Sequence, residues 1–191
     1  MRTSEVFRKT LETDIQVSLS LDGGEADVQT GVGFFDHMLK AFATHAGFGL
    51  ALTCRGDLEV DCHHTVEDVG IALGEAFSKC VGDKSGIARF GSFFVPMDES
   101  LVLAAADVSG RPFLVFDVNL PAAAVGGFDT QTAAEFFRAF AQNAGVTLHI
   151  KLFHGANTHH ILEAAFKAVG HALRLATTQT VGGVLSTKGA L

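Results

Sequence analysis

Two copies of one short motif carry the side chains best suited to bind a metal ion. His63-His-Thr-Val-Glu67 and His159-His-Ile-Leu-Glu163 both follow the pattern HHxxE. Residues three and four apart share one face of a helix, so each glutamate lies beneath both histidines of its motif. Adjacent imidazoles point about 100° apart on a helix, which suits two different metal ions better than one. The motifs therefore indicate a centre that holds two metal ions.

Matched segments extend the repeat beyond these motifs. His37–Gly47 aligns without a gap to Glu135–Gly145 at an offset of 98 residues (135 − 37), and the HHxxE motifs follow at an offset of 96 (159 − 63). The shared order and the nearly constant offset indicate two copies of one unit. We predict a single catalytic domain over residues 1–191, made of two internal repeats at about 1–88 and 89–191.

The repeat also completes a set of metal ligands. It aligns His37 with Glu135, two further side chains that can bind a metal ion. A pseudo-twofold arrangement would give each of two ions four protein ligands. Mixed imidazole and carboxylate ligation without thiolate suits Mn²⁺, Fe²⁺ or Zn²⁺ better than Mg²⁺ or Ca²⁺. The predicted ligands are His37, His63, His64, Glu67, Glu135, His159, His160 and Glu163.

The pattern of apolar residues predicts the elements that position these side chains. Alternation indicates strands at residues 15–21, 50–54, 101–107 and 146–152. Helical spacing indicates helices at residues 36–44 and 133–143, each ended by a glycine, Gly47 or Gly145. A second helix in each half begins near the HHxxE motif and continues through residue 77 or 166. The glycine pairs at 23–24, 126–127 and 182–183 indicate turns. This mixture predicts an α+β fold of two halves, each a sheet with helices on one face.

Composition excludes several classes of protein. Of the 191 residues, 48% are hydrophobic and 18% are charged, which is typical of a globular domain. The net charge of −7 argues against a nucleic-acid partner, and no apolar run is long enough to span a membrane. The amino-terminal segment has no secretory signal pattern. Three cysteines at unrelated spacings, Cys54, Cys62 and Cys80, indicate reduced thiols and a cytoplasmic protein.

Other motifs are weaker, and they leave alternatives open. Gly31-Val-Gly33-Phe-Phe-Asp36 begins like a dinucleotide-binding loop but ends in aspartate where a small residue is required. His45 could contact a substrate or make a structural hydrogen bond, whereas His149 and His171 lack a partner pattern. A dimetal hydrolase is the second interpretation as an enzyme. A metal-storage or metal-sensing protein without catalysis is the third.

Seven segments, in order along essentially the whole chain, carry a family resemblance. They are Arg8–Thr13, Phe35–Leu39, Asp61–Asp68, Arg89–Gly91, Ser109–Pro112, Asn157–Glu163 and Ser186–Gly189. Together they are similar to the imidazoleglycerol-phosphate dehydratases of histidine biosynthesis, and the double HHxxE motif is the most specific of these features. Some members carry histidine where this chain has Glu135, and carboxylate is also a good manganese ligand.

The resemblance implies a fold, a reaction and an assembly. The fold has two similar halves of the ribosomal protein S5 domain 2-like type. The reaction converts D-erythro-imidazoleglycerol phosphate, a small phosphate ester, to imidazoleacetol phosphate and water. Two Mn²⁺ ions per active site would hold the substrate ring as imidazolate, from which hydroxide can depart. The assembly is a homo-oligomer, a 24-mer built from trimers, with active sites between subunits.

The resemblance also assigns roles to individual residues. The eight ligands above take the metal positions, and Glu12, Glu67 and Glu163 become candidates for catalytic proton transfer. Guanidinium and ammonium groups suit the phosphate. The implied substrate-binding residues are Glu12, His37, His45, His63, Glu67, Arg89, Arg111, Lys167, Ser186, Thr187 and Lys188. We further expect the segment from Ser186 to order over bound substrate.

Overall fold

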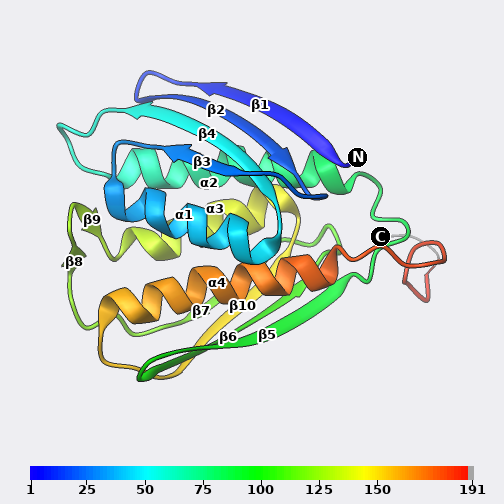
Figure 1. Cartoon of the computed structure of the whole chain (residues 1–191). Helices are drawn as coiled ribbons and strands as arrows, with labels where there is room; N and C mark the ends of the chain where they lie inside the picture. Colours follow the sequence, from blue (N-terminus) through cyan, green and yellow to red (C-terminus); the bar gives the residue numbers. More distant parts are fainter. Residues whose placement is uncertain (189–191) are drawn as a thin grey trace.

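Four helices lie between two four-stranded sheets in the computed structural model, which describes residues 1–188 (Figure 1). The first half consists of β1 (Thr3–Lys9), β2 (Thr13–Ser20), β3 (Ala26–Gln29), α1 (Gly33–Ala46), β4 (Gly49–Gly56) and α2 (His63–Val81). The second half consists of β5 (Phe90–Met97), β6 (Ser100–Asp107), β7 (Phe113–Asp117), α3 (Thr132–Ala144), β10 (Thr147–His154) and α4 (Thr158–Ala176). A small hairpin of β8 (Ala124–Val125) and β9 (Phe128–Asp129) precedes α3.

The two large sheets have the same topology. Their strand orders are β1-β2-β4-β3 and β5-β6-β10-β7. In each sheet the first three strands pair antiparallel and the last strand pairs parallel to its neighbour. The predicted α+β fold of two sheet-and-helix halves is therefore confirmed.

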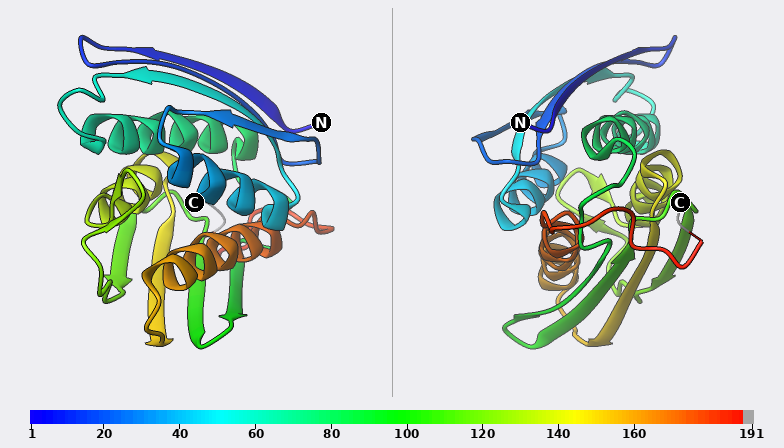
Figure 2. Two further views of the ribbon diagram at one scale, coloured as in Figure 1. Left: turned by 60° about the vertical axis from the view of Figure 1, so that its left-hand side comes forward. Right: turned by 90° about the vertical axis from the view of Figure 1, so that its right-hand side faces the viewer.

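Alternation along the strands turns one face of each sheet toward the helices. Ile15, Val17 and Leu19 of β2 are buried, as are Val102 and Ala104 of β6. Successive residues of a strand point to opposite faces, so these side chains lie on the inner face. The end view in Figure 2 shows the helices enclosed between the two sheets. The core is therefore a single layer of helices packed on both sides.

All four helices begin at the same end of the molecule, at the left in Figure 1. Helix α1 packs against α4, and α2 packs against α3, so each helix pair joins the two halves. Glycines allow this close approach: a Cβ atom at Gly74 would lie 2.7 Å from the Phe140 carbonyl oxygen, and one at Gly170 would lie 2.6 Å from that of Phe42. Each HHxxE motif is thereby placed beside a helix from the other half.

The predicted elements agree with the structure apart from their ends and several unpredicted strands. Gly47 and Gly145 end α1 and α3 in the left-handed conformation, with φ of 68° and 66°. Strands β1, β3, β5 and β7 were not predicted. Strand β5 lacks alternation because much of its apolar surface is exposed, as at Phe94.

Further predictions concern a turn, the cysteines and the helices. Gly126 and Gly127 form the turn between β8 and β9, as predicted, and Gly126 has φ of 58°. The three cysteines are free and buried, and burial raises the pKa of the Cys54 thiol to about 11. Within residues 1–188, none of the helices combines the length and apolarity that crossing a membrane requires.

Candidate functional site

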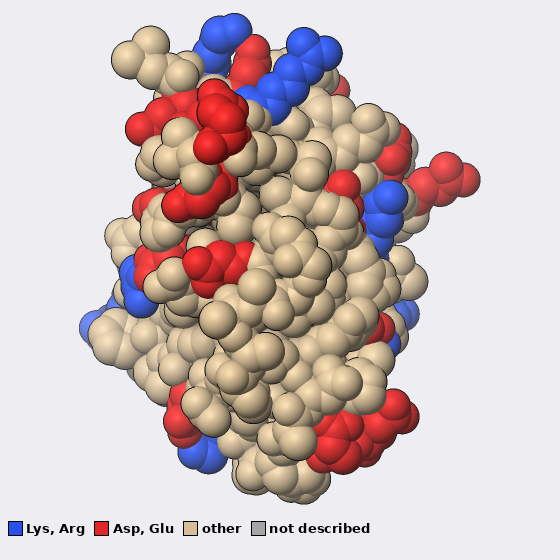
Figure 3. Space-filling model, turned by 90° about the vertical axis from the view of Figure 1, so that its left-hand side faces the viewer, with Lys and Arg blue, Asp and Glu red and all other residues tan. Residues whose placement is uncertain are grey.

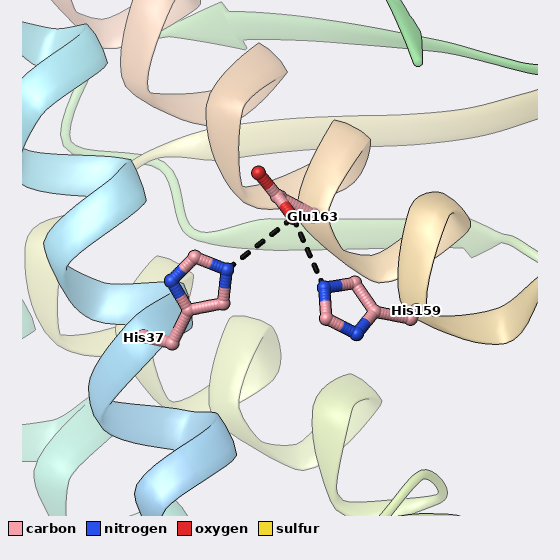
Figure 4. A group of neighbouring side chains, drawn as sticks. All are labelled: His37, His159 and Glu163. Carbon is pink, nitrogen blue, oxygen red and sulfur yellow. Dashed lines mark hydrogen bonds and ion pairs between the residues drawn. The ribbon is translucent and has the colours of Figure 1, made fainter. Parts of the chain in front are cut away.

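Three predicted ligands converge where α1 meets α4. His37 comes from α1, and His159 and Glu163 come from α4 (Figure 4). The Nε2 atoms of His37 and His159 lie 3.3 Å and 3.1 Å from the same oxygen of Glu163. One potential ligand atom from each residue lies within 4.8 Å of the others. This set, the α1/α4 cluster, could hold a metal ion between two imidazoles and a carboxylate.

Local structure fixes the α4 side of this cluster. The Asn157 side chain accepts hydrogen bonds from the backbone N–H groups of His159 and His160, so it caps the helix. Glu163, one turn later, is buried, and its carboxylate accepts a hydrogen bond from Lys167 Nζ at 2.7 Å. Burial raises the pKa of Glu163, but hydrogen bonds and charge from Lys167 and His37 outweigh burial and lower that pKa overall. The carboxylate is therefore ionised, as a metal ligand must be.

The corresponding residues on α2 and α3 are less closely gathered. His63 Nε2 lies 3.4 Å from Glu67 of its own motif. Glu135 on α3 is hydrogen-bonded instead by Arg138, one turn along the same helix. In the described chain, the α1/α4 cluster is the one group of three such residues close enough to share an ion. We call His63, Glu67 and Glu135 the α2/α3 set.

His64, the second histidine of the first motif, lies between two carboxylates. Its Nδ1–H donates to Asp57 at 2.9 Å, and its Nε2 lies 3.7 Å from the carboxylate of Glu12. The hydrogen bond with Asp57 raises the pKa of His64. The structure therefore brings Glu12, a predicted catalytic residue, beside a predicted metal ligand.

His160, the second histidine of the other motif, has a matching environment that the sequence did not reveal. Its Nδ1–H donates to Glu99 at 2.8 Å, and its Nε2 lies 3.6 Å from Asp98. Both acids lie in the turn between β5 and β6, and Asp98 has the strained φ of 48°. Two adjacent acids just before the predicted strand at 101–107 were the only available signal, and many solvated loops share it.

A cavity of about 710 Å³ lies near the carboxyl-terminal segment, and it is lined by Arg89, Ser109, Arg111 and Val184–Lys188. Arg89 donates to the Asp107 carboxylate through Nε at 2.7 Å and Nη2 at 3.1 Å, and through Nη1 to the Leu185 carbonyl at 2.6 Å. Arg111 donates to Asp107 at 3.3 Å. Ser186, Thr187 and Lys188, predicted to bind substrate, also line this anion cavity.

Burial raises the pKa of Asp107, but the hydrogen bonds and charge of Arg89 outweigh it, so the pKa is lowered overall. Asp107 therefore stays ionised and orients both arginines. The Ser109 side chain, which the sequence prediction did not include, is also buried and helps to lower the pKa of Asp107.

Two other predicted substrate-binding residues lie outside the anion cavity. Lys167 contacts Glu163, as described above. His45, in the last turn of α1, has its Nδ1 2.9 Å from Nε2 of His171. The Phe93 ring stacks on His171 at 4.2 Å. In this chain Lys167 therefore supports the Glu163 carboxylate, a predicted metal ligand, and His45 joins α1 to α4.

The predicted ligands and the anion cavity lie at opposite ends of α4. His159 is in the first turn of the helix, whereas the Arg89 N–H donates to the carbonyl of Ala176, its last residue. At 1.5 Å per residue, the two positions are about 25 Å apart. Figure 3 shows the end that carries the ligands, where more Asp and Glu than Lys and Arg are visible. We call it the ligand end.

Two sheets enclose four helices, with histidine–glutamate sets at one end and an arginine-lined cavity at the other. This arrangement defines an α+β protein that could bind a cation at one end and an anion at the other. The family model described as imidazoleglycerol-phosphate dehydratase matches residues 30–173. The chain therefore belongs to the imidazoleglycerol-phosphate dehydratase family, and it is a hydro-lyase of histidine biosynthesis.

Relatives and solved structures agree with this assignment. The chain is 59% identical to the imidazoleglycerol-phosphate dehydratase of Caldanaerobacter subterraneus subsp. tengcongensis, over 100% of both chains. It is 57% identical to that of Acetivibrio thermocellus, over 100% of this chain and 99% of the relative.

Among crystal structures, the Staphylococcus aureus dehydratase matches with a TM-score of 0.84 and 40% identity, covering 93% of this chain and 99% of that one. The Pyrococcus furiosus enzyme, in complex with (S)-C348, matches with a TM-score of 0.85 and 43% identity, covering 97% of this chain and 100% of that one.

Proposed function

We propose that this chain dehydrates D-erythro-imidazoleglycerol phosphate to imidazoleacetol phosphate at a site that holds two Mn²⁺ ions. The observation that carries the proposal is the α1/α4 cluster, with its three potential ligand atoms within 4.8 Å of one another. Two imidazoles and an ionised carboxylate fit Mn²⁺ well, and this cluster includes no thiolate that would favour a softer ion. When bound, the metal would act as a Lewis acid and would orient the substrate ring.

The chain's own residues supply binding and proton transfer. Arg89, Arg111 and Lys188 would hold the substrate phosphate in the anion cavity, because planar guanidinium groups match its oxygens. Glu12 is the preferred proton-transfer group among the three candidates. Its carboxylate is half-exposed at the ligand end and makes no hydrogen bond to the described residues, whereas Glu67 and Glu163 each lie beside a histidine of their own motif.

The separation of the two ends supports an active site shared between subunits. The ligand end and the anion cavity of one chain lie about 25 Å apart along α4. The substrate joins its imidazole to its phosphate through only three carbons, so it is far too short to reach both. A homo-oligomer in which the cavity of one chain faces the ligand end of another would satisfy both requirements. The 24-mer built from trimers and the cytoplasmic location stay predictions.

Metal-dependent turnover is the first test. Metal-stripped protein should be inactive on imidazoleglycerol phosphate, and added Mn²⁺ should restore formation of the ketone, which is followed by absorbance. Ketone formation at the full rate after exhaustive chelation would contradict the role of the metal. A folded, manganese-loaded protein that forms no ketone would contradict the assigned reaction.

Complementation between two inactive variants tests the shared site. Glu163→Gln damages the ligand end, and Arg111→Ala damages the anion cavity. If each site takes one end from each of two chains, co-expression of the variants will create some sites with both ends intact. We expect each variant alone to be nearly inactive and the mixed oligomer to regain measurable kcat/KM. A mixture no more active than the sum of its parts would show that each chain uses only its own residues.

A further inference from the structure

The second histidine of each HHxxE motif is held by a hydrogen-bond acceptor that is not among the predicted metal ligands. His64 Nδ1–H donates to Asp57 at 2.9 Å, and His160 Nδ1–H donates to Glu99 at 2.8 Å. An ionised carboxylate can only accept, so it fixes the ring hydrogen on Nδ1 and leaves the Nε2 lone pair free. Carboxylate–histidine pairs of this kind orient many metal-binding imidazoles.

Glu99 is itself held firmly, and by groups other than the histidine. Its Oε1 accepts hydrogen bonds from the backbone N–H groups of Ala156 and Asn157, at 3.1 Å and 2.8 Å. Its Oε2 is the atom that faces His160. One carboxylate therefore ties the β5–β6 turn to the start of α4 and aims the ring at the same time.

Asp57 is fixed through its backbone instead. Its N–H donates to the Glu12 carbonyl at 3.1 Å, and its own carbonyl accepts from Val60 at 2.8 Å. Its Oδ2 faces His64, whereas its Oδ1 is buried and has no hydrogen-bond partner among the described residues. An unpaired buried oxygen destabilises the fold. A carboxylate kept in that position is better explained by its effect on His64 than by a contribution to stability.

The two carboxylates come from segments that do not correspond between the halves. Asp57 follows β4, whereas Glu99 lies in the β5–β6 turn, and the matching β1–β2 turn contributes Glu12 instead. A duplicated unit would carry both acids at matching positions, so the repeat does not account for this arrangement. Carboxylates from two unrelated segments therefore make the same contact to Nδ1. This points to a need for the two histidine rings to be held in one orientation.

The first histidine of each motif provides a contrast. His63 and His159 face their own glutamates through Nε2, at 3.4 Å and 3.1 Å, and neither donates from Nδ1 to a carboxylate of the described chain. The supporting contact is therefore specific to the second histidines. Exposed ion pairs contribute little to stability, so a purely structural role for these partly exposed pairs would also be small.

We infer that Asp57 and Glu99 are positioning residues, which hold His64 and His160 with Nε2 turned toward the metal ions at the start of α2 and α4. This inference rests on the proposed function, because it takes both histidines as metal ligands. Loss of either carboxylate frees the ring to rotate and to move its hydrogen to Nε2. Because metal binding then has to restore the orientation and hydrogen position of the ring, the affinity for the metal ion falls.

The test measures metal binding directly. Metal-free wild-type protein, Asp57→Asn and Glu99→Gln are titrated with Mn²⁺, and free ion is quantified by its electron paramagnetic resonance signal. An amide can donate to Nδ1 and so favour the wrong ring form. We expect the affected site in each variant to bind Mn²⁺ about 10–100-fold more weakly. Glu25→Gln, an exposed acid before β3, is the matched control and should bind like wild type.

Thermal unfolding of the metal-free variants separates positioning from folding. We expect both amide variants to unfold within a few degrees of wild type, since the lost ion pairs are partly exposed and each amide keeps an oxygen that can accept hydrogen bonds. If Glu99→Gln unfolds early, Glu99→Asp serves in its place, because it keeps the charge but shortens the reach to His160. If Asp57→Asn unfolds early, Asp57→Glu serves in its place, because it keeps the charge but changes the reach to His64. Wild-type Mn²⁺ affinity in the folded variants would overturn the inference alone. A wild-type protein that binds no Mn²⁺ would overturn the proposed function and this inference with it.

Discussion

The α1/α4 cluster and the α2/α3 set are built from corresponding parts but differ in completeness. His37 meets His159 and Glu163 across the α1–α4 contact, whereas its counterpart Glu135 is hydrogen-bonded by Arg138. The first group carries two imidazoles and one carboxylate, and the second carries one imidazole and two carboxylates. The fold therefore repeats the positions of the ligands but not their chemistry.

The glutamates of the two motifs show the same divergence. Glu163 is 10% exposed and is paired with Lys167, whereas Glu67 is 45% exposed. The position that corresponds to Lys167 (167 − 96) is occupied by Ile71. Burial of an ionised carboxylate requires a compensating partner, which only one half provides. The α1/α4 cluster is therefore the more preorganised half of the proposed centre, and we expect the α2/α3 set to need an ion or a neighbouring chain to complete it.

The largest expected effect comes from the two motif glutamates. Glu163→Gln should lower kcat/KM by more than about 100-fold. Even residues that only hydrogen-bond a metal ligand typically lower metal affinity or activity about 10–100-fold when they are mutated. Glu163→Gln also leaves the Lys167 charge without its partner. Glu67→Gln is the matched change in the α2/α3 set and should lower kcat/KM by less. Steady-state kinetics and manganese content of both variants make the comparison. Equal losses would show that the two sets are equally preorganised.

A second comparison concerns two matched arginine–aspartate pairs. Arg89 precedes β5 and is bonded to Asp107 at the end of β6, whereas Arg2 precedes β1 and is bonded to Asp22 just after β2. Of Arg89 and Arg2, only Arg89 lines the anion cavity. Arg89→Ala should raise KM by about 10-fold or more, because a charge-assisted hydrogen bond contributes about 1.5–3 kcal/mol.

Arg2→Ala is the control for this prediction. It removes an equivalent ion pair and a hydrogen bond to the Thr177 carbonyl, at 2.6 Å, without touching the cavity. It should therefore lower the unfolding temperature slightly and leave KM unchanged. If the two variants shift KM alike, the effect of Arg89 is structural and the anion cavity does not hold the phosphate.

The sequence predicted where candidate metal ligands would gather, as His37, His159 and Glu163 do, better than it predicted the groups around them. The HHxxE motifs and the matched His37 and Glu135 could be found because helical spacing fixes which side chains share a face. Asp57 and Glu99 could not be found, since their contacts depend on how two loops fold against helix ends. The opposite placement of the anion cavity was equally hidden, because Arg89 meets the end of α4 only through tertiary structure.

The smallest expected effect concerns the contact between His45 and His171, which has no imidazole counterpart in the other helix pair. The corresponding residues there are Asn143 (45 + 98) and Glu75 (171 − 96). Burial lowers the pKa of His45, helped by the Lys167 charge and opposed by Glu163. Burial also lowers the pKa of His171, helped by the charges of His45 and Arg174.

A histidine whose pKa is lowered by folding stabilises the protein fully above its unfolded pKa of about 6.5 and loses that contribution as pH falls through the folded pKa. Acidification from pH 7.5 to 5.5 should therefore weaken the α1–α4 contact, by about 1 kcal/mol if the hydrogen bond is lost. Unfolding temperatures of metal-free protein across this range measure the effect. His171→Gln should reduce the slope of unfolding temperature against pH. His149 is exposed on β10, so His149→Gln should leave that slope unchanged. Equal slopes in wild type and His171→Gln would place the acid sensitivity elsewhere, and the two helix pairs would then differ at their ligand ends alone.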